Sequence, residues 1–317
     1  MKISAFMEQE LISIPYAMGK IDALYYKSTV PRRKEGMGTV IIHVHGFLGN
    51  FLEGSQRFLP PLLARAGYSS LCMNTRLATF GLFFGYGIID DTIPQLDAAI
   101  IYLKKLGYKS IVLSGYSIGG SVVLRYASLR SDVSKFPSLK GIIAVSTPYS
   151  HPDSVRRRWE RWGSNPSYDE IYRRVRETLR PDPMHTAEDR TMVIYRARGD
   201  TLNPEHTELY TYKTWWFLAG PEAESAKCYK QITEINIPLL LIQGRRDQDL
   251  RPEEAEDLAS LALHAGNGDA SALYLDAAHD FDGCEETLGE AVTNWLDRRL
   301  GAEPGWNGPK TAPKTSD

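Results

Sequence analysis

The chain has 317 residues, of which 43% are hydrophobic and 24% are charged. That composition is typical of a soluble globular protein, and the length allows one large domain or two small ones. Thirty-seven Lys and Arg residues nearly balance thirty-nine Asp and Glu residues, so the formal net charge is only −2. Nucleic-acid binders and membrane-surface binders usually carry a basic excess, so we expect neither nucleic acid nor lipid to be the main partner.

The cysteines and the apolar segments predict a cytoplasmic protein. The three cysteines, Cys72, Cys228 and Cys284, are too few and too scattered for a disulfide framework or a Cys-based zinc site, and we expect them to be reduced and buried. No segment reaches the ~18 apolar residues of a membrane span. The N-terminal segment lacks a sustained apolar region and does not resemble a signal peptide.

Short apolar runs alternate with helical patterns along most of the chain. The first two runs, 11–16 and 21–26, predict an antiparallel hairpin at a sheet edge. Further strands are predicted at 39–45, 70–74, 110–114, 141–146, 238–243 and 271–276, and helices at 58–66, 93–106, 118–129, 253–264 and 284–300. This alternation predicts an α/β fold, a doubly wound and mostly parallel sheet with helices on both faces.

The alternation is interrupted after the sixth predicted strand. Residues 149–235 are rich in proline and contain an Arg-rich helical stretch at 155–180. An insertion at this point lies above the carboxyl ends of the strands, where ligands bind. We therefore predict a core formed by residues 1–148 and 236–300 and a cap or lid at 149–235. The Pro- and Gly-rich residues 301–317 are expected to be a disordered tail.

The strongest chemical signal is Gly115-Tyr116-Ser117-Ile118-Gly119, which follows an apolar run and opens a helical pattern. A Gly-x-Ser-x-Gly sequence between a strand and a helix is typical of a nucleophile elbow, whose tight turn exposes the serine hydroxyl. The alternative is a glycine-rich turn that only packs a helix against a strand. The strand before the motif and the helix after it favour Ser117 as a nucleophile.

A second loop, His45-Gly46-Phe47-Leu48-Gly49, directly follows the strand predicted at 39–45. In hydrolases of this layout, such a loop supplies one backbone N–H of the oxyanion hole and the residue after the nucleophile supplies the other. The donors here would be the amides of Phe47 and Ile118. We interpret His45 as a structural residue that holds the loop, and not as the base.

A nucleophilic serine needs a histidine base and a carboxylate that orients it, and in this architecture they follow in the order serine, acid, histidine. Asp247 follows the strand predicted at 238–243, and His279 follows the strand predicted at 271–276. Both side chains would then lie at carboxyl ends of strands and converge on Ser117. Asp249 is the alternative acid, whereas Asp280 is too close to the histidine in sequence to receive its Nδ1 proton.

Substrate contacts are predicted mainly in the insertion. Trp215 and Trp216 could form an apolar wall or the core of the cap, and Tyr116 lies next to the nucleophile. The arginines of residues 155–180 are interspersed with acids, which is typical of a solvated helix face. The alternative is that one arginine points inward and binds a substrate carboxylate or phosphate. No histidine has metal-ligand spacing, so no metal or other cofactor is expected.

Taken together, the elbow at Ser117, the loop at 45–49, Asp247 and His279 resemble the α/β-hydrolase superfamily over residues 10–300. The His-Gly-Phe-Leu-Gly-Asn stretch at 45–50 is similar to that of cinnamoyl and feruloyl esterases and related carboxylesterases. The resemblance implies the α/β-hydrolase fold and a serine hydrolase that cleaves a small carboxylic ester through an acyl-enzyme. The same triad could act on a C–C bond, a lactone or an amide, or catalyse acyl transfer. A non-catalytic small-molecule-binding protein is a further alternative, and a homodimer is the assembly that we consider.

Overall fold

The structure, a computed structural model, describes residues 7–30, 38–78, 87–130, 138–186, 189–195, 197–198, 201–202 and 208–300. Its main feature is an eight-stranded sheet with the order β1-β2-β4-β3-β5-β6-β11-β12. The strands are β1 (Met7–Tyr16), β2 (Gly19–Ser28), β3 (Thr39–Val44), β4 (Ser69–Met73), β5 (Ser110–Tyr116), β6 (Leu139–Val145), β11 (Leu239–Gly244) and β12 (Ala270–Leu275). All eight strands were predicted from the sequence, with ends that differ by a few residues.

The sheet is mostly parallel, as predicted. β1 and β2 form an antiparallel hairpin, and β2 also pairs antiparallel with β4. The remaining neighbours, from β4 through β3, β5, β6 and β11 to β12, are all parallel. Parallel strands bring their carboxyl ends to one edge of the sheet, so the loops that leave β3, β5, β6, β11 and β12 meet there.

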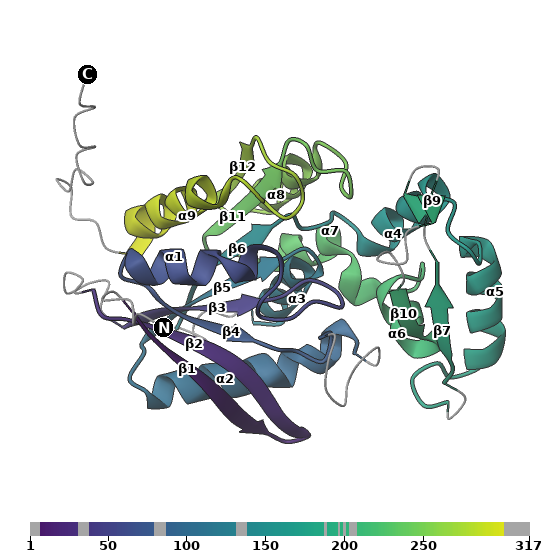
Figure 1. The fold of residues 1–317 in the computed structure, drawn as a ribbon, viewed down its shortest axis with the longest axis horizontal. Helices are drawn as coiled ribbons and strands as arrows, with labels where there is room; N and C mark the ends of the chain where they lie inside the picture. The colour runs from purple at the N-terminus through teal and green to yellow at the C-terminus, as the bar shows by residue number, and fades with distance from the viewer. Residues whose placement is uncertain are drawn as a thin grey trace.

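Helices cover both faces of this sheet (Figure 1). Along β3 the side chains of Val40 and Ile42 face one hydrophobic cluster and that of Ile41 faces another, as expected for a strand buried on both faces. The first cluster includes residues of α2 (Ile93–Lys105), α3 (Ile118–Ser128) and α8 (Glu254–His264), and the second includes residues of α1 (Leu59–Arg65) and α9 (Glu285–Leu300). The prediction of a doubly wound sheet is confirmed.

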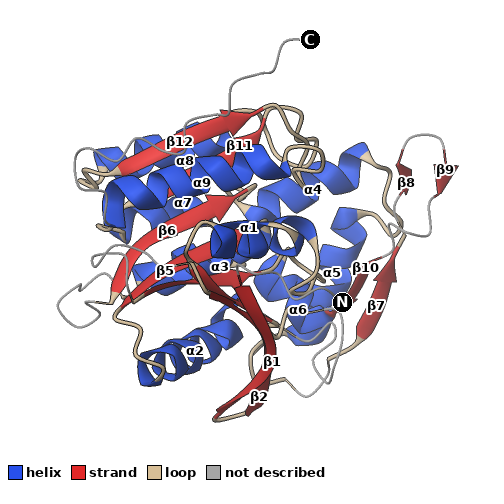
Figure 2. Ribbon diagram, turned by 60° about the vertical axis from the view of Figure 1, so that its left-hand side comes forward, coloured by secondary structure: helices blue, strands red, loops and turns tan. Residues whose placement is uncertain are grey.

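The described residues of the insertion after β6 add no strand to the main sheet. Its helices are α4 (His151–Arg161), α5 (Tyr168–Leu179), α6 (Tyr212–Leu218) and α7 (Cys228–Gln231), and its short strands are β7 (Thr191–Ile194), β8 (Ala197–Arg198), β9 (Thr201–Leu202) and β10 (Glu208–Thr211). Among the described residues, short 3₁₀ segments lie at Gly54–Arg57 and Ile89–Thr92 outside the insertion, and at Glu224–Ala226 and Ile232–Glu234 within it. In Figures 1 and 2, α4, α5, α6, β7 and β10 lie together beside the sheet.

The prediction of one helical stretch over 155–180 is wrong, because the chain breaks it into α4 and α5. Gly163 adopts a positive φ of 56° just after α4, a conformation that few other residues adopt. Ser167 then caps α5 by accepting a hydrogen bond from the backbone N–H of Glu170 at 3.3 Å. Gly163 therefore ends the first helix, and Ser167 begins the second.

Within the insertion, α4, α5, α6, β7 and β10 share a hydrophobic cluster of their own, whereas Cys228 of α7 belongs to the cluster of the main sheet. The largest fully buried side chains of the insertion's own cluster are Trp159, Trp215 and Tyr210, and Phe47 of the core packs against its edge. Among the described residues, no helix is both long and apolar enough to cross a membrane. The tail predicted at 301–317 lies outside the described residues.

Candidate active site

Ser117 occupies a sharp turn between β5 and α3. Its backbone has φ 54° and ψ −124°, which is a strained conformation for a residue with a side chain. The Ser117 N–H donates to the carbonyl of Val145 at 2.8 Å, and the Ser117 carbonyl accepts from the N–H of Gly120 at 2.9 Å. These bonds hold the turn, so the serine side chain projects from the carboxyl edge of the sheet.

The glycines of the turn are required by close backbone packing. A Cβ on Gly115 would lie 2.2 Å from the carbonyl oxygen of Gly119, and a Cβ on Gly119 would lie 2.2 Å from that of Val44. Both distances are far below van der Waals contact. The geometry is that of a nucleophile elbow, as the motif predicts.

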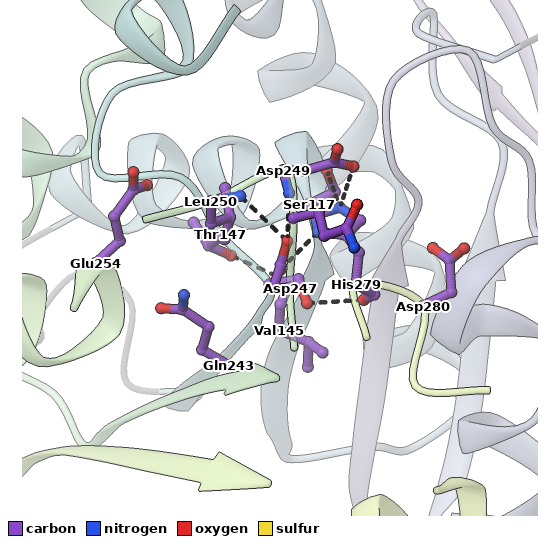
Figure 3. Close-up of polar contacts among 12 residues, drawn as sticks. Ser117, Val145, Thr147, Gln243, Asp247, Asp249, Leu250, Glu254, His279 and Asp280 are labelled. Carbon is purple, nitrogen blue, oxygen red and sulfur yellow. Dashed lines mark hydrogen bonds and ion pairs between the residues drawn. The ribbon is translucent and has the colours of Figure 1, made fainter. Parts of the chain in front are cut away.

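Ser117, His279 and Asp247 form a continuous chain of hydrogen bonds (Figure 3). The Nδ1 atom of His279 lies 2.7 Å from Oδ2 of Asp247, and its Nε2 atom lies 3.1 Å from the Ser117 Oγ. The side chain of Asp247 is completely buried, whereas that of His279 keeps 17% of its surface exposed. Three residues from three separate strand ends are thus arranged so that the imidazole can take the hydroxyl proton.

The charges of this chain reinforce one another. Burial alone would raise the pKa of Asp247, but the hydrogen bond and charge of His279 and the backbone N–H groups of Asp249 and Leu250 outweigh it and lower that pKa. Burial alone would lower the pKa of His279, yet the hydrogen bond and charge of Asp247, with the charges of Asp249 and Asp280, raise it. Asp247 is therefore the ionised partner of a histidine whose protonated form is stabilised.

Asp249, the alternative acid, occupies a different place. Its Oδ2 atom lies 4.0 Å from Nε2 of His279, on the side of the ring that faces Ser117, and it makes no hydrogen-bond-length contact with that nitrogen. Its backbone N–H donates to Oδ1 of Asp247 at 2.8 Å. Asp249 thus helps to orient Asp247, and only Asp247 lies within hydrogen-bond distance of Nδ1.

His45 holds the loop after β3 in place. Its Nδ1 atom lies 2.7 Å from the carbonyl oxygen of Gly46, and its Nε2 atom accepts a hydrogen bond from the N–H of Thr75 at 3.0 Å. Burial lowers the pKa of His45 to about 4, although the Gly46 carbonyl opposes the shift, so the ring is neutral near pH 7. Both ring nitrogens are engaged, which agrees with a structural role.

The two predicted oxyanion donors belong to segments that lie next to Ser117. Ile118 is the first residue of α3, and the first N–H groups of a helix have no partner within it. Phe47 follows Gly46, where an added Cβ would lie 3.5 Å from the Cβ of Ser117. The next two amides of that loop are already used, because Leu48 donates to Leu77 at 3.1 Å and Gly49 donates to Gly46 at 3.2 Å.

Ser146 is a residue of the site that the sequence analysis missed. It follows β6, is fully buried and has a positive φ of 48°. Its Oγ donates to the backbone carbonyl of His279 at 2.8 Å, and its N–H donates to Ile242 at 2.8 Å. The signal was available, because β6 is another parallel strand whose carboxyl end carries a polar residue.

Tyr116, which the sequence predicts to contact the substrate, uses its hydroxyl within the protein. The side chain is buried, and its OH donates a hydrogen bond to Asp280. Its ring centroid lies 5.4 Å from that of His279, and its ring fills the space beside Gly54, where a Cβ would lie 2.3 Å from Cε1. Tyr116 therefore packs against the loops that carry Gly46, Gly54 and His279.

The two predicted tryptophans differ in position. Trp215 has no exposed surface and packs edge-on against Trp159 at 6.4 Å, so it belongs to the core of the insertion. Trp216 is 8% exposed and stacks on Tyr172 at 6.2 Å. Tyr210 contacts the loop at 45–49, because its ring stacks on that of Phe47 at 5.1 Å.

The described residues contain no cluster of three His, Cys, Asp or Glu side chains arranged to hold a metal ion. The cysteines are free thiols. Cys72 and Cys228 are buried, as predicted, whereas Cys284 is partly exposed. None of the three takes part in the contacts around Ser117 described above.

Solved structures resemble this fold over most of its length. An esterase from Pyrococcus furiosus aligns with a TM-score of 0.61 at 18% identity, covering 93% of this chain and 92% of the other. Est1E from Butyrivibrio proteoclasticus, also solved with ferulic acid bound, aligns with a TM-score of 0.60 at 16% identity over 92% and 98% of the two chains. A monoacylglycerol lipase from Paleococcus ferrophilus aligns at 0.58 and 18% identity over 92% and 100%.

A comparison with curated proteins finds no match. Residues 39–281 match the family described as alpha/beta hydrolase fold. This segment begins at the first parallel strand and ends just beyond His279, so it contains the elbow and both loops discussed above. The chain therefore belongs to the α/β-hydrolase fold family.

Proposed function

We propose that this protein is a serine hydrolase that cleaves a carboxylic ester through an acyl-enzyme. The observation that carries the proposal is the chain from Ser117 Oγ to His279 Nε2 at 3.1 Å and from His279 Nδ1 to Asp247 at 2.7 Å. It starts at a strained elbow, where the serine hydroxyl is held at the end of a strand. The esterase and lipase names of the structural neighbours favour an ester over the other substrates of such a triad.

In the first half-reaction, Ser117 Oγ attacks the ester carbonyl while its proton moves to Nε2 of His279. Asp247 stabilises the resulting imidazolium through Nδ1–H. The negative charge that develops on the carbonyl oxygen is bound by the N–H groups of Phe47 and Ile118. The tetrahedral intermediate collapses, the alcohol leaves with the proton from Nε2, and the acyl group stays on Ser117.

In the second half-reaction, a water molecule gives its proton to Nε2 and attacks the acyl carbonyl. The intermediate again places its negative charge between the Phe47 and Ile118 amides. Collapse returns the proton to Ser117 and releases the carboxylic acid. All of these steps use residues of the core, which is consistent with a division of residues 1–148 and 236–300 as the core and 149–235 as the cap.

The cap is proposed to limit which esters reach Ser117. It contacts the loop that carries Asp247 and Asp249, because Ser154 Oγ of α4 donates to the backbone carbonyl of Asp249 at 3.0 Å. It also contacts the loop at 45–49 through the stacked rings of Tyr210 and Phe47. A substrate bound at Ser117 would therefore lie beside the cap.

The proposal is tested by labelling the protein with a fluorophosphonate and assaying p-nitrophenyl esters. We expect covalent labelling at Ser117, identified by peptide mass spectrometry, and hydrolysis that the label abolishes. Ser121 of the same helix is buried and is a suitable control site. A protein that binds the probe reversibly, or that hydrolyses no ester, would contradict the proposal.

A further inference from the structure

Helix α4 carries four arginines along the side of the active site. Three of them have hydrogen-bond partners away from Ser117, namely Glu160 for Arg156 at 2.9 Å, Glu254 for Arg157 at 2.8 Å and the backbone carbonyl of Gln248 for Arg161 at 3.1 Å. These contacts tie α4 to itself and to the loop after β11. The fourth arginine, Arg158, is placed differently.

Arg158 is the arginine of α4 that approaches the residues around the histidine. Its Nη1 atom lies 3.8 Å from Oδ2 of Asp249, and the same carboxylate oxygen lies 4.0 Å from Nε2 of His279. The side chain of Arg158 is only 18% exposed, compared with 51% for Arg156. A guanidinium with little access to water is thus two contacts away from the imidazole that faces Ser117.

The guanidinium of Arg158 lies 5.8 Å from the centre of the Trp162 ring, but most of its N–H groups have no hydrogen-bond partner among the described residues. Its Nε atom donates to the carbonyl of Ser154 at 3.4 Å, and the 3.8 Å to Asp249 exceeds hydrogen-bond distance. Among the residues that the structure describes, the two Nη groups of Arg158 make no hydrogen bond. A guanidinium presents its N–H groups as a planar fork that matches a carboxylate, and such charge-assisted bonds are the strong ones.

We propose that Arg158 binds a carboxylate carried by the ester substrate, so that the protein prefers monoesters with a second, ionised acid group. This inference rests on the proposed function, because it concerns the substrate of the same serine. In the free protein Asp249 partly neutralises Arg158 from 3.8 Å. When the substrate binds, its carboxylate takes the open Nη donors.

The alternative to this proposal is that Asp249 binds a positively charged group of the ester. Asp249 lies 3.8 Å from Arg158 and 4.0 Å from the imidazole of His279, which becomes positively charged during the reaction. A cationic substrate group beside Asp249 would be repelled by both. An anion at Arg158, by contrast, would meet a guanidinium whose closest carboxylate among the described residues is outside hydrogen-bond distance.

The test compares matched anionic and neutral esters. On the acyl side, the p-nitrophenyl monoester of adipic acid is compared with p-nitrophenyl hexanoate, and on the alcohol side, 4-carboxyphenyl acetate is compared with phenyl acetate. We expect the native protein to prefer the anionic member of one pair in kcat/KM. That pair identifies the side of the ester bond on which the carboxylate lies.

In Arg158→Gln, we expect the ratio of kcat/KM for the anionic ester to that for the neutral ester to fall about 10- to 100-fold, the range for a hydrogen bond to a charged group. Arg161→Gln is the matched control, one turn along the same helix, and should leave the ratio unchanged. Asp249→Asn should raise the ratio, because it removes the competing carboxylate. Added salt should weaken the preference.

The inference is overturned if neither ratio changes in Arg158→Gln, or if the ratio falls equally in Arg161→Gln. It is also overturned if a choline ester is preferred and that preference is lost in Asp249→Asn. In each case the neutral esters are still hydrolysed, so the proposed function stands. A native protein that hydrolyses none of the four esters would instead contradict the proposed function.

Discussion

The proposed core and the proposed cap, residues 149–235, are constructed in different ways. In the core, Ser117, Asp247 and His279 each lie within a few residues of a strand end, so the parallel sheet itself brings them together. In the insertion, α4, α5, α6, β7 and β10 add no described strand to the main sheet and share an aromatic cluster, whereas α7 packs in the same hydrophobic cluster as the sheet. We conclude that the sheet positions the three residues, and that packing among side chains positions most of the insertion.

If the sheet positions the reacting residues, replacing the nucleophile should cause the largest loss of activity. Ser117→Ala should lower kcat for p-nitrophenyl esters by about 10⁴- to 10⁶-fold, because it removes the atom that attacks. The melting temperature should not fall, since alanine keeps the Cβ of the strained turn. Residual activity within tenfold of the native protein would show that another residue is the nucleophile.

Asp247→Asn should cause the next largest loss, about 10⁴-fold in kcat, because an amide favours the wrong tautomer of His279; that magnitude is the one measured for the corresponding change in a serine protease. Asp249→Asn is the matched control in the same loop and should cost much less. Steady-state kinetics of the two variants decide between them. A greater loss from Asp249→Asn would make Asp249 the orienting acid.

For the cap, the expected effect is on stability. Trp215→Ala should lower the free energy of unfolding by about 3–5 kcal/mol, because it leaves a cavity in the cluster formed with Trp159. Trp216→Ala should cost less, since Trp216 lies at the edge of the cluster with 8% of its surface exposed. Thermal unfolding measures both. An unchanged melting temperature of Trp215→Ala, with a higher KM for bulky esters, would restore the substrate role that the sequence predicted.

Replacing Ser146 tests whether the sheet alone positions His279 or whether the Ser146 hydroxyl is also needed. Ser146→Ala removes the hydroxyl that donates to the His279 carbonyl, and we expect kcat to fall about three- to tenfold with little change in KM. Ser146→Gly loses the same hydroxyl but removes the backbone strain that the positive φ of 48° causes. It should therefore have the same low kcat as the alanine variant and melt at a higher temperature than that variant. A fully active glycine variant would show that the hydroxyl does not position His279.

The smallest predicted effect is on the pH dependence. The base must be neutral to take the serine proton, and nearby carboxylates raise the pKa of His279, so kcat/KM should decline on the acidic side at a pH above that of an ordinary histidine. Asp249→Asn removes one of these charges and should move this acid limb to lower pH. The pH profile of kcat/KM measures the shift. A limb that stays in place would mean that Asp249 is neutralised by Arg158.

Much of the core could be read from the sequence. The elbow is specified locally, since Gly115 and Gly119 leave room for the backbone of α3 and β3, and the strand and helix that flank Ser117 are each visible as apolar patterns. The positions of Asp247 and His279 follow from the same logic. Ser146 escaped notice because a single serine after a strand carries no motif.

Sequence alone determined which residues can react, because the spacing of apolar runs fixes the strands and the strand ends fix the loops. Tertiary structure decided what surrounds them. Whether Trp215 is buried, whether Tyr210 or Trp216 meets Phe47, and which arginine of α4 approaches Asp249 depend on how α4 and α6 pack. Those contacts join residues far apart in the chain, and the periodicity of one segment does not encode the partner it will meet in another.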